Sequence, residues 1–138
     1  MMMGMEIAEI DDLVVLIRSM LSVVEENQCE TACEVFHKST SEIDTDSPTL
    51  NLVIQFMENS ILSPHNFPLG SYYLQRIPKF EKISVLDVSL LFSLLANKKM
   101  RSRVLNIIWE SIQSSKMSYD IIAKVYQAPP EILQKTPR

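Results

Sequence analysis

Apolar residues recur at intervals of three and four along almost the whole chain, which is the spacing of one face of an α-helix. In the stretch 9–26 the apolar positions are Ile10, Leu13, Ile17, Met20, Leu21 and Val24. This pattern predicts a first helix over 9–26. A second helix is expected over 28–39, because Asn27 and Glu30 stand at the spacing of a capping box.

Local signals predict five more helices. Ser47 followed by Pro48 is typical of a helix start, with serine as the N-cap and proline at the first helical position. Ser84 and Asp87 form another capping-box pair, and Pro78 disfavours helical backbone in the residue before it. The expected ranges are 48–62, 69–76, 84–96, 99–115 and 118–127.

Composition favours the same all-helical fold. Only 2 of the 138 residues are glycine, whereas all-β proteins use glycine freely in turns. With 46% hydrophobic and 22% charged residues, the chain has the balance of a folded domain. We expect one domain over 9–127, a frayed or disordered N-terminus over 1–8, and a proline-containing tail over 128–138.

The helix starts are regularly spaced, at Asp12, Pro48, Ser84 and Asp120, which stand 36 residues apart. Side chains of one kind align at this offset: Val14 with Leu50 and Leu86, Cys33 with Leu69 and Leu105, and the ring-bearing residues His37, Tyr73 and Trp109. One helical hairpin cannot bury its own apolar face, so such units must stack. The spacing therefore predicts an α-solenoid of about three helix-hairpin repeats plus a partial fourth.

The unit from Ser84 to Asp120 resembles the pentatricopeptide and tetratricopeptide repeats. It has a capped helix, a short link over 97–99, a second helix and a turn before the next unit. The tetratricopeptide tryptophan, glycine and proline marks are missing, and the repeat match fails at Asn59, Ser60 and Pro68. The resemblance implies a right-handed array that holds a partner segment on its concave face.

No residue pattern indicates catalysis, a metal or a cofactor. Cys29, Cys33 and His37 share one face of an expected helix, and His65 is a conceivable fourth ligand. However, three ligands spaced along about 12 Å of one helix cannot reach a single ion. Neither histidine stands near a nucleophile in a recognisable context, and phosphate-loop and metalloprotease signatures are absent. We therefore expect a non-catalytic protein without a cofactor.

Two groups of residues are candidates for contact with a partner. Lys98, Lys99, Arg101 and Arg103 form a basic cluster at an expected hairpin turn, suited to phosphate or to an acidic partner. The alternative is a solvated tip that interacts with the C-terminal dipole of the preceding helix. Tyr73 and Trp109 could present their rings to a peptide or to bases, and the alternative for them is packing between hairpins.

The leading functional hypothesis is a scaffold that binds a protein partner, because the net charge of −4 does not favour nucleic acid. The alternative is single-stranded RNA binding in the pentatricopeptide manner, with polar readers near the start of each first helix. Asn51 and Ser89 fit that role, but Val15 does not.

The array ends inside its fourth unit, with an apolar helix face that lacks a neighbour. We therefore expect self-association through this uncapped end, or a chain that is a piece of a longer repeat protein. The N-terminus has no basic region of a signal peptide, and the most apolar stretch, 85–96, is too short to span a bilayer. The expected location is intracellular, cytoplasmic or nuclear, without a membrane.

Overall fold

A computed structural model describes Val15, Ser19, 25–63 and 67–127 of the chain. Within these residues the secondary structure is helical, without a β-strand, so the all-α prediction is confirmed. The elements are α2 (Glu26–Thr40), α3 (Pro48–Leu62), α4 (Pro68–Arg76), the 3₁₀-helix η1 (Ile77–Lys79), α5 (Val85–Leu94), α6 (Lys98–Gln113) and α7 (Tyr119–Gln127). The expected helix over 9–26 lies outside the described residues, apart from Val15, Ser19, Glu25 and Glu26.

The side-chain caps predicted at Ser47 and Ser84 form as expected. The Ser47 hydroxyl accepts a hydrogen bond from the Thr49 backbone N–H, with Pro48 at the start of α3. At α5 both bonds of the Ser84 and Asp87 capping box are present. These bonds satisfy backbone N–H groups that have no partner inside the helix.

The predicted capping box of Asn27 and Glu30 is wrong. Glu25 occupies the N-cap position of α2, and no side chain makes a cap bond there. Asn27 already lies within the first turn of the helix, so its side chain is displaced from the N-cap position. α4 ends at Arg76 as predicted, and the 3₁₀-helix η1, which contains Pro78, follows it directly. A 3₁₀ turn accommodates proline near its start, since that backbone N–H needs no helical partner.

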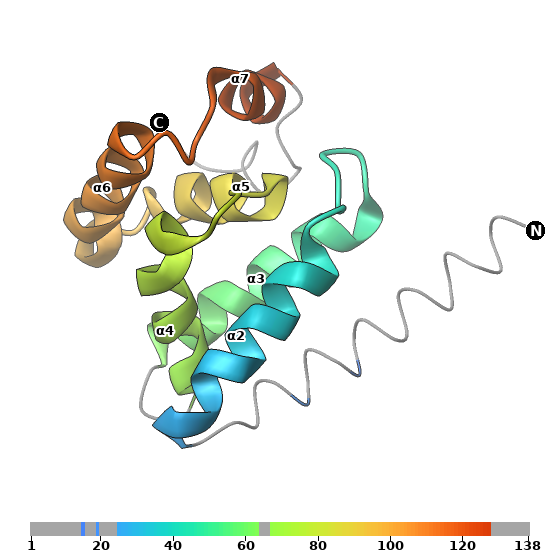
Figure 1. Ribbon diagram of the computed structural model, residues 1–138, viewed down its shortest axis with the longest axis vertical. Coiled ribbons are helices and arrows are strands. Elements are labelled where there is room, and N and C mark those ends of the chain that lie inside the picture. The colour runs from blue at the N-terminus through green and yellow to red at the C-terminus, as the bar shows by residue number, and fades with distance from the viewer. Residues whose placement is uncertain (1–14, 16–18, 20–24, 64–66, 128–138) are drawn as a thin grey trace, which may run out of the picture.

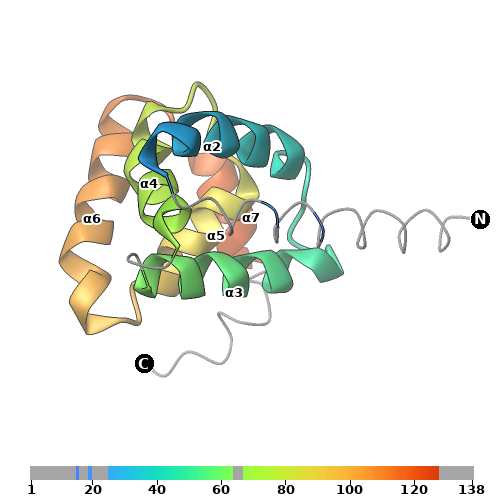
Figure 2. The ribbon, with the colours of Figure 1, turned by 90° about the horizontal axis from the view of Figure 1, so that it is seen from below.

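The helices pack in two rows. In one row α3 packs against α5, and α5 packs against α7; in the other, α2 packs against α4, and η1, which continues α4, packs against α6. The rows are joined where α3 meets α4 and where α5 meets α6. Figures 1 and 2 show α5 in the middle of the molecule, with α6 at one edge.

The two rows approach each other closely at Gly70. Its backbone N–H donates to the Ser60 hydroxyl at 2.9 Å, and that hydroxyl donates to the Phe67 carbonyl at 3.0 Å. A Cβ atom at position 70 would lie 2.5 Å from the Ser60 Oγ and 2.7 Å from the Ile61 N. Glycine is therefore required where α4 crosses α3, and Ser60, which breaks the sequence repeat, is part of this contact.

Candidate functional site

A buried polar cluster joins α2, α4 and α5. The Asp87 carboxylate, in the first turn of α5, accepts a hydrogen bond from the Tyr73 hydroxyl at 2.6 Å and one from the Ser84 backbone N–H at 3.0 Å. The Nδ1 atom of His37, on α2, lies 3.3 Å from the Asp87 Oδ2 atom. Asp87 and Tyr73 are fully buried. Because a buried carboxylate needs partners, this cluster fixes the positions of three helices relative to one another.

The half-buried His37 ring has partners at both nitrogens and stacks on a second ring. Its Nε2 atom lies 3.0 Å from the Lys82 carbonyl oxygen, and the ring stacks on Phe80 with centroids 3.8 Å apart. Burial lowers the pKa of His37, but the Asp87 hydrogen bond and charge, together with the Lys82 carbonyl, outweigh burial and leave the pKa raised. In its protonated form the imidazole donates from both nitrogens. Nδ1 lies 3.1 Å from the Tyr73 hydroxyl and 3.3 Å from the Asp87 carboxylate, and Nε2 faces the Lys82 carbonyl.

The arrangement of His37 and Asp87 is that of a pair that holds helices together, and it lacks the open nitrogen that acid–base catalysis needs. In a catalytic histidine–carboxylate pair, the nitrogen remote from the carboxylate must face a nucleophile or a substrate. In His37 that nitrogen, Nε2, is bonded to a backbone carbonyl instead. The cluster therefore links secondary-structure elements and presents no free base.

Tyr73, a predicted partner-binding residue, lies in the core and not on the surface. Its side chain is fully buried, with the Phe36 ring edge-on at 5.2 Å, so it offers no surface to a partner. Burial, assisted by the nearby Asp87 charge, holds the pKa of Tyr73 well above its usual range, so the hydroxyl remains a donor. The physical reason is that α2 and α4 pack together, which encloses the ring that α4 turns toward α2.

The two cysteines are core residues. Cys29 and Cys33 are both buried, and burial raises the pKa of the Cys33 thiol to about 12. A thiol with such a pKa is neither a good nucleophile nor a ready metal ligand at neutral pH. Among the described residues no group of histidine, cysteine and acidic side chains is arranged to hold a metal ion, and His65 lies outside them.

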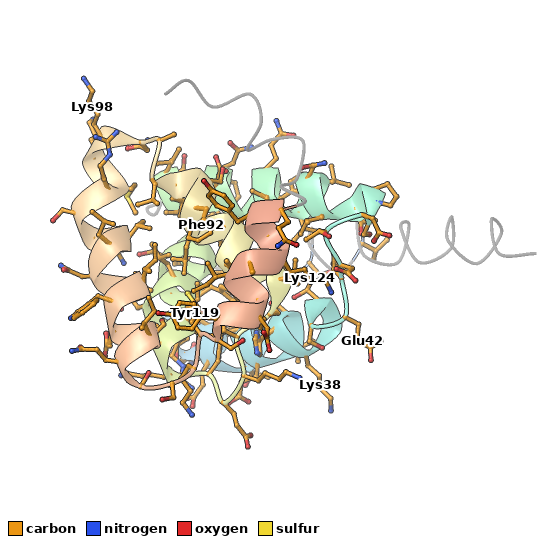
Figure 3. The ribbon with its side chains drawn as sticks, turned by 90° about the horizontal axis from the view of Figure 1, so that it is seen from above. Lys38, Glu42, Phe92, Lys98, Tyr119 and Lys124 are labelled. Atoms are coloured by element: carbon orange, nitrogen blue, oxygen red, sulfur yellow. The ribbon has the colours of Figure 1, made fainter. Side chains whose placement is uncertain are left out.

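The basic cluster lies at the start of α6, where Lys98, Lys99 and Arg101 are exposed and Arg103 is half-buried. Arg101 donates from Nε to the Leu95 carbonyl at 2.9 Å, at the C-terminal end of α5. Arg103 donates from Nη2 to the Ser71 hydroxyl at 3.3 Å. These two arginines thus support the fold, while the two lysines project into solvent. Figure 3 shows Lys98 at the extremity of α6.

The outer face of α6 carries apolar side chains that the core does not use. Trp109 is 61% exposed, Leu105 51% and Ile112 42%. Leu105 stands in the same repeat column as Cys33 and Leu69, which are buried, so the column does not predict its position. The buried side of α6 supplies the core residues Val104 and Ile107. Of these three residues, the sequence analysis predicts only Trp109 as a partner-binding residue. The signal for Leu105 and Ile112 was present, because apolar residues on both sides of one helix are visible in the sequence.

Comparison with known proteins supplies no template. No protein-family model matches the chain, and no curated protein or solved structure is significantly similar to it.

The predicted RNA readers do not share one accessible surface. Of the two residues that fit the role, Ser89 is fully buried on α5 and Asn51 is half-buried on α3. Ser89 cannot meet a base, because α5 packs against α3, α6 and α7.

None of the helices in the described part of the chain has the length and apolar character that crossing a membrane requires.

Proposed function

We propose that the chain is a non-catalytic helical-repeat scaffold that binds a protein partner. The packing order of the helices carries this proposal. The helices that pack most extensively on each other belong to one hairpin or to neighbouring hairpins: α3 with α4 and α5, α5 with α6 and α7, α2 with α4, and η1 with α6. The His37–Asp87 contact reaches farther, from α2 in the first unit to α5 in the third. This order is expected of a right-handed α-solenoid with about three hairpins and a partial fourth.

A stacked array of this kind offers an extended surface without needing a pocket. The polar groups that could have served catalysis support the same conclusion. Both ring nitrogens of His37 and the Asp87 carboxylate are bonded within the chain. The exposed apolar residues, in contrast, lie on the outside of the array, where a second macromolecule can reach them.

Binding of single-stranded RNA is the second candidate function. The exposed Lys98, Lys99 and Arg101 favour it, because basic side chains at a helix start can contact phosphates. The net charge of −4 and the burial of Ser89 weigh against it. A pentatricopeptide mode needs one accessible reader per repeat, and the third unit lacks one.

Two probes applied to the full-length chain separate these functions. The first is labelled single-stranded RNA of mixed sequence, measured by fluorescence anisotropy across a salt series. The second is a library of displayed peptides selected on the folded chain, with recovered peptides measured by calorimetry. The scaffold proposal predicts peptides that bind with one-to-one stoichiometry, and little RNA binding even at low salt. Tight RNA binding that weakens steeply with salt, without recovered peptides, overturns the proposal.

A further inference from the structure

The outer face of α6 forms a continuous row of side chains one above the other. Residues three and four apart on a helix share a face, because an α-helix has 3.6 residues per turn. The members of this row, which we call the α6 row, are Lys98, Arg101, Leu105, Trp109 and Ile112, and all five are exposed. The row is basic over the first turns of α6 and apolar over the remainder.

The apolar part of the α6 row is not required by the fold. α6 packs on η1 and α5 through the side where Val104, Ile107 and Ser111 are buried. Around the helix axis, Leu105 and Ile112 lie roughly 80–100° from Val104, beside this buried side, and Trp109 lies roughly 140° from Val104. Helical geometry places Leu105 and Trp109 roughly 160° from Ile107 around the axis. Three adjacent apolar side chains on an outward face, one of them tryptophan, have the composition of the centre of a protein interface.

Charge indicates the kind of partner. The chain as a whole has a net charge of −4, yet α6 carries four cations, Lys98, Lys99, Arg101 and Arg103, and one acidic residue, Glu110. The cations stand at the N-terminal end of the helix, where the macrodipole adds further positive potential. A binding partner that covers the row is therefore attracted if it carries acidic residues near this end and apolar residues beyond it.

We propose that the α6 row is a docking surface for an acidic amphipathic helix of a protein partner, which rests on the scaffold function proposed above. The spacing of Leu105, Trp109 and Ile112 matches the apolar stripe of a helix laid alongside α6, because such a stripe also repeats every three to four residues. Lys98 and Arg101 then face the acidic end of the partner. Leu105 and Ile112 have neither charge nor a ring to stack on a base, so the row fits a protein better than RNA.

The test uses a displayed library of amphipathic helices of about 18 residues, with apolar positions kept and polar positions randomised. Selection is made on the full-length chain, and each recovered peptide is measured on three single variants. Leu105→Ser removes one apolar member of the row, and Leu62→Ser is its matched control, since Leu62 is 48% exposed on α3. Lys98→Glu changes the charge of the row, and Lys38→Glu makes the same change on α2, far from Lys98 (Figure 3).

The proposal predicts that the recovered peptides are rich in Asp and Glu. Their affinity falls about tenfold or more with Leu105→Ser and with Lys98→Glu, and remains within about twofold in the two controls. The emission of Trp109, the only tryptophan, shifts to the blue when these peptides bind. Circular dichroism shows that each variant is folded.

Three results overturn the proposal. Recovered peptides that are basic, or that bind Leu105→Ser as tightly as the wild type, reject the α6 row while leaving a scaffold that binds elsewhere. Sedimentation that shows a wild-type dimer and a monomeric Leu105→Ser variant assigns the row to a second copy of the chain instead. Recovery of no peptide, together with salt-sensitive RNA binding, rejects both the row and the scaffold function.

Discussion

Helices α5 and α6 are consecutive in the chain and pack against each other, yet their surroundings differ. Eight of the ten residues of α5 are buried, against three of the sixteen residues of α6. α5 packs against α3, α6 and α7, so it is covered on several sides, whereas α6 packs mainly against α5 and η1. The apolar side chains of α5 are therefore explained by the fold, and those on the outer face of α6 are not. The difference separates residues that serve folding from residues available for binding.

The largest effect is expected at Asp87, which connects α5 to its neighbours. Asp87→Ala removes the acceptor for the Tyr73 hydroxyl and the charge beside His37, and leaves both groups without that partner. Breaking a buried charged pair in this way costs about 3–5 kcal/mol. Urea unfolding followed by circular dichroism measures the loss. A loss below about 1 kcal/mol would contradict the assignment of Asp87 as the link between α2, α4 and α5.

The same substitution in the two helices compares them directly. Leu90→Ala leaves a cavity at a fully buried position of α5 and is expected to lower the free energy of unfolding by about 2–5 kcal/mol. Leu105→Ala, on the outer face of α6, is expected to change it by no more than about 0.5 kcal/mol. Thermal and urea unfolding of the two variants check this pair. Equal losses would show that Leu105 is packed in the folded chain.

At their N-termini the two helices are alike, because both start with a side-chain cap. Ser84 caps α5, and the Asn97 side-chain oxygen accepts bonds from the Lys99 and Met100 backbone N–H groups at the start of α6. Asn97→Ala is expected to cost about 0.5–2 kcal/mol, the usual range for a lost N-cap. Hydrogen exchange should show faster opening of the first turn of α6 in this variant, while amides of α5 stay protected. Uniform acceleration across both helices would argue against a local cap.

The smallest effect concerns pH and tests the surroundings of α5. The pKa of His37 is higher in the folded chain than its ordinary value of 6.5, so the folded state holds the proton more tightly. This contribution to stability is present in full below the unfolded pKa and is lost as the pH rises through the folded pKa. We expect the free energy of unfolding of the wild type to fall across this window, with a weaker fall in His37→Gln. Parallel profiles between about pH 5 and pH 8 would contradict the pairing of His37 with Asp87.

Helix boundaries were predictable where local chemistry sets them. Pro48–Leu62 was predicted to the residue, and the start of α5 to within one, because Ser47 and Ser84 satisfy backbone N–H groups in any surroundings. The prediction of Asn27 as an N-cap was wrong because α2 can begin at any of several positions near Glu25, and the sequence does not distinguish among them. The 3₁₀-helix η1 was not predicted, because its burial against α6 depends on residues far along the chain.

The candidate site was predictable only in part, since periodicity finds a helix face without showing what covers it. His37, Tyr73 and Trp109 stand in one repeat column, yet Tyr73 is buried, His37 is half-buried and Trp109 is exposed. α2 and α4 cover each other at this column, whereas no described element covers Trp109. The sequence did contain a usable signal, because apolar residues lie both beside and opposite Ile107 on α6.

The most direct measurement is acrylamide quenching of Trp109, the single tryptophan of the chain, at several protein concentrations. Trp109 in the folded chain is expected to be quenched nearly as efficiently as in the urea-unfolded chain, because its side chain is 61% exposed. The quenching efficiency is expected to stay the same when the protein is diluted. Strong shielding of Trp109 in the folded monomer would show that the outer face of α6 is covered by the chain itself, and would contradict its availability to a partner.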